Sequence, residues 1–227
     1  NQAAAAAAAG APTRMIAAVG ADGDRYLRHL SAAGIDTSAV ARLADVPTGA
    51  ATVIVDSTGE NVIVVTEGAN GRVSAEQVAA ETWTPDDVVV VQFEIPAAVV
   101  RAVATRAADA GATLVVNPSP WRDDLGDVLE QADVVIVNEH ERRQLGERVA
   151  QDRICTTRGG DGARWAGEVA TPEPITPLDT AGAGDAFAGT LAAALVAGAG
   201  RGDALQRAVD AATAACLRRG AQQWLTD

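Results

Sequence analysis

The strongest candidate for chemistry is a run of small residues that ends in an acid. Residues 179–189 read DTAGAGDAFAG, and an Ala/Leu-rich segment that predicts a helix follows to about Val196. Glycine has no Cβ, so Gly182, Ala183 and Gly184 allow the backbone to approach a ligand closely. The first N–H groups of a helix have no partner within it, and together with the helix dipole they favour a phosphate or a developing anion. This stretch therefore predicts an anion-binding turn.

The acid of this turn, Asp185, falls in the first turn of the predicted helix. A carboxylate beside a phosphate site can accept the proton of an acceptor hydroxyl while the N–H groups hold the γ-phosphoryl group. The pattern thus indicates phosphoryl transfer with Asp185 as the base. The alternative is an ordinary strand-to-helix turn in which Asp185 only begins the helix.

Composition narrows the class of protein. The chain has 227 residues, which suits one sizeable domain over residues 1–227. Its formal net charge of −12 argues against a nucleic-acid partner. No segment has the character of a transmembrane helix or a signal peptide, so we expect no membrane partner and a cytoplasmic location. Cys155 and Cys216 lie in apolar surroundings and are expected to be buried thiols.

Alternating helices and strands position the candidate residues. Apolar runs predict strands at 14–19, 87–93, 113–117, 133–137 and 153–157. Helices are predicted at 1–10, 24–33, 74–81, 96–110 and 203–219, the last ending at Gly220. Strand–helix–strand repetition indicates an α/β fold with helices on both faces of an open sheet. In such sheets ligands bind beyond the carboxyl ends of the strands.

A segment rich in β-branched residues interrupts this alternation of helices and strands. Residues 51–56 and 61–66 are β-branched runs separated by the turn-forming sequence Ser-Thr-Gly-Glu, so 48–66 predicts a β-hairpin. A two-stranded hairpin is marginally stable alone, which makes pairing with a second copy physically reasonable.

The motif D-T-x-G-A-G-D-x-F is similar to the C-terminal signature of the ribokinase-like, or phosphofructokinase-B, sugar kinases, and further motifs extend the resemblance over nearly the whole chain. The resemblance implies a three-layer α/β/α fold with a central, mostly parallel sheet and a small β lid at 48–66. It implies ATP-dependent phosphorylation of a sugar's primary hydroxyl. Asp185 would be the base, and the N–H groups around Gly182, Ala183 and Gly184 would stabilise the transferring group.

The resemblance assigns sugar contacts to two residues. Asn1-Gln2 resembles the end of the family's Gly-Gly-Lys-Gly-x-Asn-Gln turn, which gives Asn1 contacts with sugar hydroxyls; the alternative is a helix N-cap. Glu94 is similar to the family glutamate that contacts the sugar, and its alternative is a solvated loop acid. The turn's glycines and lysine and an earlier aspartate are not in this sequence, so we expect that the true beginning of the protein is absent.

Two further motifs resemble the nucleotide side of the family site. N-x-x-E at Asn138 and Glu141 implies an asparagine near the ATP phosphates and a glutamate that organises the water shell of Mg²⁺. A capped helix with a solvated acidic face is the alternative. Thr157, Gly159 and Gly162 match T-x-G-x-x-G, whose loop accommodates ATP together with Gly184.

The stretch between these two motifs is short. Only about fourteen residues separate Asn138 from Arg153, markedly fewer than in the family pattern. We expect either a trimmed crossover or a missing internal stretch.

The C-terminal R-x-G-A-Q at 218–222 resembles a loop that binds a monovalent cation, K⁺, in ribokinases. Backbone carbonyls and a carboxylate suit such a hard cation. The matching positions are Asp179, Ala181, Ala215, Arg218 and Gly220. Trp224 stands near the family's small hydroxyl residue and departs from the pattern.

These resemblances favour D-ribose as the substrate and D-ribose 5-phosphate as the product, because Asn-Gln and G-A-Q are ribokinase-like details. Fructose, deoxyribose, a keto-deoxy sugar acid and a nucleoside such as adenosine remain alternatives. A catalytically silent relative that binds sugar or nucleotide is a different class. We expect sugar and ATP as ligands, Mg²⁺ and K⁺ as cofactors, and a homodimer formed through the lid.

Overall fold

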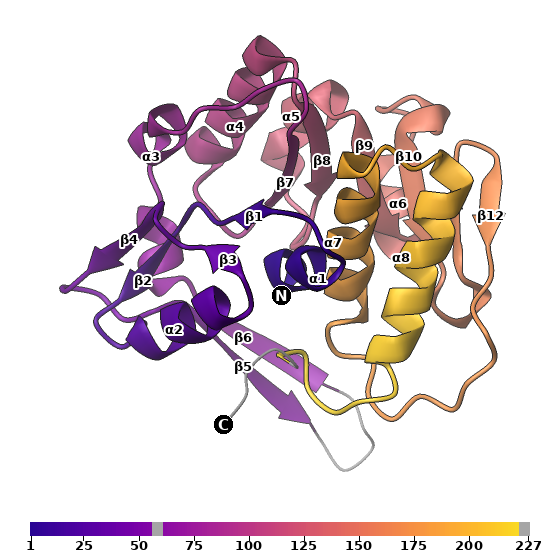
Figure 1. Ribbon diagram of the computed structural model, residues 1–227, viewed down its shortest axis with the longest axis horizontal. Helices are drawn as coiled ribbons and strands as arrows, with labels where there is room; N and C mark the ends of the chain where they lie inside the picture. Colours follow the sequence, from indigo (N-terminus) through magenta and orange to yellow (C-terminus); the bar gives the residue numbers. More distant parts are fainter. Residues whose placement is uncertain (56–60, 223–227) are drawn as a thin grey trace.

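The computed structural model describes residues 1–55 and 61–222, with a central sheet between two layers of helices (Figure 1). Among those residues six strands form this sheet, in the order β12-β11-β10-β9-β8-β7. Their bounds are β7 (Val88–Gln92), β8 (Thr113–Asn117), β9 (Val134–Asn138), β10 (Ile154–Thr157), β11 (Ala163–Trp165) and β12 (Glu168–Ala170). Strands β7 to β10 are mutually parallel, which confirms the predicted α/β class.

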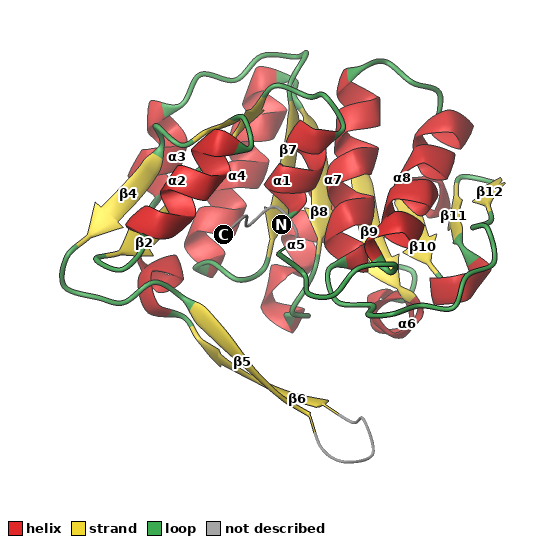
Figure 2. Ribbon diagram, turned by 60° about the horizontal axis from the view of Figure 1, so that its bottom comes forward, coloured by secondary structure: helices red, strands yellow, loops and turns green. Residues whose placement is uncertain are grey.

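Helices cover both faces of the sheet, as the continuous apolar strands predicted. Side chains of Val116 and Val135 pack with α4 (Ala97–Ala110), α5 (Gly126–Gln131) and α6 (Glu139–Leu145). Their neighbours Val115 and Ile136 point to the other face and pack with α7 (Ala183–Val196) and α8 (Arg201–Ala215). The chain therefore forms three layers, α/β/α (Figure 2).

Two antiparallel strands at one end of the sheet were not predicted. β11 and β12 each have three residues and form a meander with β10. Their tight connection contains Ala166, which has a positive φ of 52°. Runs of three residues are too short to show the period-2 alternation by which strands are recognised in a sequence.

The first helix, α1 (Gln2–Ala8), packs directly on α7. Gly189 of α7 makes this contact possible, because a Cβ there would lie 2.7 Å from the Cβ of Ala5 and 2.9 Å from the backbone nitrogen of Ala6. The alanine-rich sequence of α1 thus allows close backbone approach between the two helices.

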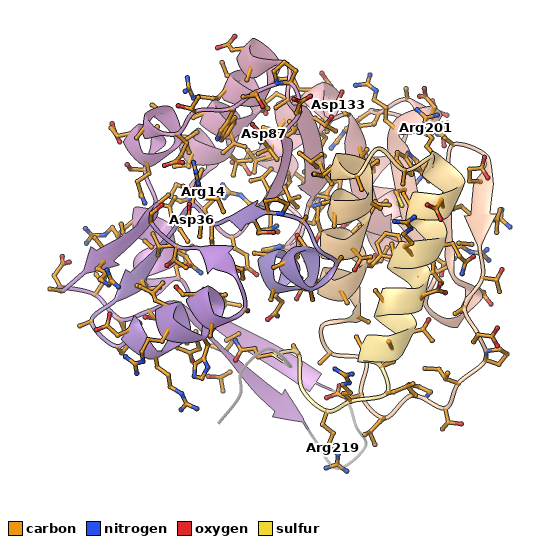
Figure 3. All side chains as sticks on the ribbon, viewed as in Figure 1. Arg14, Asp36, Asp87, Asp133, Arg201 and Arg219 are labelled. Atoms are coloured by element: carbon orange, nitrogen blue, oxygen red, sulfur yellow. The ribbon has the colours of Figure 1, made fainter. Side chains whose placement is uncertain are left out.

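The predicted strand at 14–19 is wrong as a single element. It divides into β1 (Thr13–Arg14) and β2 (Ala17–Gly20), because each half pairs with a different strand. Their parallel partners are β3 (Ile35–Asp36) and β4 (Val40–Leu43), and α2 (Asp24–Ala32) lies between them in the sequence. Figure 3 shows Arg14 beside Asp36, an ion pair of 3.0 Å across β1 and β3.

The predicted hairpin is present as β5 (Ala50–Val55) and β6 (Asn61–Thr66), which pair antiparallel. It projects from the body of the molecule (Figure 2), and its predicted turn lies outside the described residues. The side chains of Val64 and Val65 are 52% and 60% exposed. Consecutive strand residues point to opposite faces, so both faces of the hairpin are open here.

Short elements complete the described chain. Helix α3 (Ala75–Ala80) begins with the predicted capping box, in which Ser74 and Gln77 exchange hydrogen bonds. The 3₁₀ helices are η1 (Gly68–Arg72), η2 (Asp123–Leu125), η3 (Gln151–Arg153) and η4 (Gly159–Asp161). No helix in the part of the chain that the structure describes is both long enough and apolar enough to cross a membrane.

The last helix ends earlier than predicted, at Ala215 rather than at 219. The carbonyl of the next residue, Cys216, accepts hydrogen bonds from the backbone N–H groups of Leu178 and Asp179 at 2.8 and 3.3 Å. A tertiary contact thus replaces the continuing helix.

The two cysteines differ in burial. Burial raises the pKa of the Cys155 thiol to about 12. Cys216 is only half-buried, so the prediction of a buried thiol is wrong there.

Candidate active site

The candidate residues gather at the edge of the sheet where its parallel strands end. Strands β7 to β10 run in one direction, so their last residues lie along the same edge. Those last residues are Gln92, Asn117, Asn138 and Thr157. This is the edge at which an open α/β sheet binds its ligands.

The turn before α7 has the geometry of an anion-binding loop. Gly182 has a φ of +80°, and a Cβ there would lie 2.9 Å from the Cα of Ala221, so the turn requires glycine. The N–H of Ala183 bonds the carbonyl of Thr180, and the first hydrogen bond into the helix is made by Ala186. The backbone N–H groups of Gly184 and Asp185 have no acceptor within residues 1–55 and 61–222. They can bind an anion at the N-terminal end of the helix.

Two side chains from the start of α1 hold Asp185. The Asn1 amide donates to Oδ2 at 2.9 Å, and the Gln2 amide donates to Oδ1 at 3.1 Å. Asn1 occupies the N-cap position of α1, but its side chain makes no capping hydrogen bond. Its amide therefore serves the site rather than the helix end.

Glu94 lies on the same side of the site, two residues after the end of β7. Partial burial of its carboxyl, and then the nearby charge of Asp185, raise the pKa of Glu94. Much of the Glu94 side chain is nevertheless exposed, so solvent limits this effect. The structure thus brings together Asn1, Glu94 and Asp185, the three residues expected on the sugar side.

Asn138 and Glu141 form a capping box at the start of α6. The Asn138 side chain accepts from the N–H of Glu141, and the Asn138 N–H donates to Oε2 of Glu141, both at 2.9 Å. Burial raises the pKa of Glu141, and the hydrogen bond from Asn138 opposes that rise. The alternative of a capped helix is therefore confirmed, whereas a solvated acidic face is wrong for Glu141, which is 8% exposed.

A capped Glu141 still suits a metal that is held through water. Its Oε1 has no hydrogen-bond partner among the described residues. No group of three or more His, Cys, Asp and Glu side chains within those residues could hold a metal ion. Mg²⁺ commonly binds through one or two carboxylates, phosphates and waters, so one such oxygen fits it. The magnesium role stays a prediction.

The loop after β10 carries the predicted nucleotide residues. The Thr157 hydroxyl lies 3.4 Å from the carbonyl of Val137. Gly159 and Gly162 have positive φ values of 54° and 80°, and the N–H of Arg158 closes the loop on the carbonyl of Gly162 at 2.7 Å. A Cβ on Gly159 would meet no atom within 4 Å. The loop is fixed in shape and open on its outer side, as a phosphate loop must be, and its role stays a prediction.

Asp179 joins the two loops expected to bind a monovalent cation. Its carboxylate accepts from the N–H of Ala181 at 2.9 Å and from the N–H of Gly220 at 2.8 Å. These two backbone hydrogen bonds hold the pKa of Asp179 below its ordinary value. The carbonyl of Ala215 accepts from the N–H of Arg218 at 3.1 Å. The K⁺ role of these loops stays a prediction, and Trp224 lies outside the described residues.

Sequence reasoning missed Gln2 and Gln92 as site residues. The Gln2 amide also donates to Oδ1 of Asn117 at 3.0 Å, and the Gln92 amide donates to Oε1 of Gln2 at 2.6 Å. One signal was available, because strands β7, β8 and β9 read VVVVQ, TLVVN and VVIVN, each apolar run ending in an amide.

A separate depression lies away from Asp185. It encloses about 770 Å³ between α6 and strands β10 to β12. Several arginines line it, among them Arg201, which is labelled in Figure 3 and whose guanidinium lies 5.4 Å from the ring centre of Trp165. Neither Asp185 nor Glu141 belongs to this depression. The candidate site is identified by its chemistry rather than by its volume.

Comparison with known proteins agrees with this geometry. Residues 1–227 match the family described as pfkB family carbohydrate kinase, and the chain belongs to that family. It is 33% identical to the ribokinase of Bacillus subtilis (strain 168) over 238 residues, covering 98% of this chain and 81% of the relative. It is 30% identical to the deoxyribokinase of Salmonella typhi, covering 85% of this chain and 71% of the relative.

A solved structure is also similar. The ribokinase of Cryptococcus neoformans var. grubii serotype A in complex with ADP superposes with a TM-score of 0.86 at 28% identity, over 98% of this chain and 83% of that chain. The fold is therefore the ribokinase-like α/β fold that the sequence predicted. The chain is a phosphotransferase that acts on a sugar hydroxyl with ATP as co-substrate.

Proposed function

We propose that this kinase phosphorylates the primary hydroxyl of D-ribose and releases D-ribose 5-phosphate. The observation that carries the proposal is Asp185 in the first turn of α7, beside the N–H groups of Gly184 and Asp185, which have no acceptor among the described residues. The similarity to ribokinases favours ribose among the sugars. The similarity to a deoxyribokinase makes deoxyribose the second candidate.

In the proposed reaction Asp185 accepts the proton of the sugar hydroxyl as its oxygen attacks the γ-phosphorus of ATP and the bond to ADP breaks. Each carboxylate oxygen of Asp185 has two lone-pair directions, and one amide occupies one direction on each oxygen. Each oxygen therefore keeps one lone pair that can accept the hydrogen bond of the sugar hydroxyl. The N–H groups of Gly184 and Asp185, at the start of α7, would stabilise the charge on the transferring phosphoryl group.

Sugar binding is assigned to Asn1 and Glu94, and nucleotide binding to Asn138, Thr157 and the loop glycines. Glu141 would hold the water shell of Mg²⁺ through Oε1. The metal, when bound, supplies positive charge beside the phosphates. K⁺ would be held by the carboxylate of Asp179 and by the backbone carbonyls of Ala181, Ala215, Arg218 and Gly220.

The hairpin of β5 and β6 is proposed as the lid over the sugar and as the contact in a homodimer. Both of its faces carry exposed valines, Val64 and Val65, so one face can cover the site while the other meets a partner. A lid that closes over the sugar excludes water, which would otherwise compete as the acceptor. We also propose that the whole chain forms one domain and that the protein is cytoplasmic.

The test is ATP turnover by the intact protein with ribose, deoxyribose, fructose or adenosine, each with and without K⁺. Turnover confined to ribose and raised by K⁺ is expected. Turnover with another acceptor alone would contradict ribose but keep the kinase. Tight ATP binding without turnover on any of them would favour the catalytically silent relative.

A further inference from the structure

We propose that Gln2, Gln92 and Asn117 form a relay of amides that orients Asp185 for proton transfer. The inference rests on the proposed function, in which Asp185 is the base. Gln2 lies at the centre of the relay. Its Nε2 donates to Asp185 Oδ1 at 3.1 Å and to Asn117 Oδ1 at 3.0 Å, while its Oε1 accepts from Gln92 Nε2 at 2.6 Å.

The direction of every hydrogen bond in the relay is fixed by its ends. Asn117 Nδ2 donates to the backbone carbonyl of Ile136 at 3.0 Å, which turns the Asn117 oxygen towards Gln2. A carboxylate only accepts, so Gln2 must present its NH₂ group to Asp185. A reversed Gln2 would set oxygen against oxygen at both Asp185 and Asn117. One arrangement therefore satisfies all four side chains.

The relay is anchored on rigid elements. Gln92 and Asn117 are the last residues of β7 and β8 and are directly paired in the parallel ladder. Gln2, Gln92 and Asn117 are all part-buried, where hydrogen bonds compete less with water than at the surface. The two strand ends thus hold Gln2 from the sheet side.

The packing of α1 on α7 sets the distance between Gln2 and Asp185. Gly189 lies four residues after Asp185, so both face the same side of α7. Its close approach to Ala5 and Ala6 brings the start of α1 against the start of α7. The backbone contact at Gly189 and the hydrogen bonds of the relay therefore both hold the start of α1 against the start of α7.

These observations make Gln2, Gln92 and Asn117 positioning residues. None of the three has been assigned a contact with a reacting atom, and they act through Asp185. Orientation of a base strongly affects the rate of proton transfer, while substrate binding depends on it little. Loss of the relay is expected to lower kcat and leave the KM values unchanged.

The first test uses Gln92→Met in the intact protein, because Gln92 donates to Gln2, and the hydrogen bonds of the described residues connect it to Asp185 through Gln2. Its kcat is expected to fall about tenfold, with KM for ATP and sugar changed less than about twofold. Gln131→Met is the matched control, since the side chain of this exposed glutamine at the end of α5 donates to the carbonyl of Asp127, its one partner in the described part of the chain. The control is expected to keep the wild-type kcat.

A second variant keeps the size of the side chain. Gln92→Glu removes the donor to Gln2, so kcat is expected to fall as in Gln92→Met. Asn117→Leu removes both the acceptor for Gln2 and the donor to the carbonyl of Ile136, so its kcat is expected to fall in the same way. Folded Gln92 variants with kcat within twofold of the wild type would overturn the relay.

A measurement without turnover separates the relay from the proposed function. In NMR spectra of the side-chain amides, Asp185→Asn is expected to shift the NH₂ signals of Gln2 and, through it, Gln92. An unchanged Gln92 signal would contradict the relay even if the enzyme is active. Absence of phosphorylation by the wild type would instead contradict the proposed function.

Discussion

Two carboxylates of the site, Glu94 and Glu141, carry their charge in surroundings that disfavour it. Burial raises the pKa of both, and the charge of Asp185 adds to the effect at Glu94. Glu94 is largely exposed, so solvent weakens the effect there, whereas Glu141 is only 8% exposed.

The environment of Glu141 predicts a pH dependence of stability. Its pKa is higher in the folded protein than in the unfolded chain, so the folded state binds more protons between the two values. The contribution of Glu141 to stability is therefore fully present below its unfolded pKa and falls as the pH rises through the folded pKa. Glu141→Gln keeps an oxygen for the N–H of Asn138 and removes this loss.

We expect the free energy of unfolding to decline less between about pH 4 and pH 7 in Glu141→Gln than in the wild type. Urea unfolding at both pH values measures it. Glu139→Gln is the control, because this neighbouring side chain is exposed. Equal pH dependence in the wild type and Glu141→Gln would show that burial does not raise the pKa of Glu141.

At the scale of elements, the contact between α1 and α7 links packing to chemistry. The two helices touch through Gly189 and small alanines, and the start of α1 supplies both amides that hold Asp185. Close packing leaves no room for even one added methyl group. The precision of the site therefore depends on a residue that has no polar side chain.

Gly189→Ala is expected to destabilise the protein by about 1–3 kcal/mol, because its Cβ would meet backbone atoms that cannot move aside. It is also expected to lower kcat by displacing Asn1 and Gln2. In Gly202→Ala, within α8, the new Cβ would meet only the carboxylate of Glu168 at 3.1 Å, so this control should be neutral or more stable. Equal stability of Gly189→Ala and the wild type would contradict the account of the helix contact.

At the scale of the whole molecule, the hairpin of β5 and β6 stands apart from the three layers (Figure 2). Few contacts to the body can stabilise such a projection, and a two-stranded sheet is weak alone. Pairing with a second hairpin would bury the exposed valines on one face.

Val65→Asp is therefore expected to shift the protein from dimer to monomer in analytical ultracentrifugation. A carboxylate at this position would be buried without a partner in the dimer but solvated in the monomer, so the substitution disfavours the dimer. Val169→Asp is the matched control, because Val169 is 58% exposed on β12, away from the hairpin. A monomeric wild type, or a Val65→Asp dimer, would argue against the lid contact.

The parallel strands β7 to β9 were predictable because each is a continuous apolar run that ends in an amide residue, whereas no helix was predicted over α5. Strands β11 and β12, and the division of 14–19 into two strands, were not, because two or three residues show no periodicity. The end of α8 was missed because Leu178 and Asp179, far away in the sequence, take the carbonyl of Cys216. Local patterns do not contain such tertiary contacts.

The site likewise has features that depend on adjacent residues and features that depend on tertiary contacts. The motif around Asp185 correctly predicted the start of a helix, since a helix start depends on adjacent residues, whereas the role of Asp185 as the base stays a prediction. The relay was not predicted, because Gln2 and Gln92 are 90 residues apart and meet only when α1 packs over the sheet. The roles of the nucleotide, magnesium and potassium residues stay predictions.

The most direct test of the central claim is the turnover of Asp185→Asn. Asparagine has nearly the same shape but cannot accept the hydroxyl proton, so kcat is expected to fall about 10²- to 10⁴-fold while ATP binding changes little. Asp203→Asn, in the first turn of α8, is the control and should retain wild-type turnover. Near-normal turnover of Asp185→Asn would show that another group is the base.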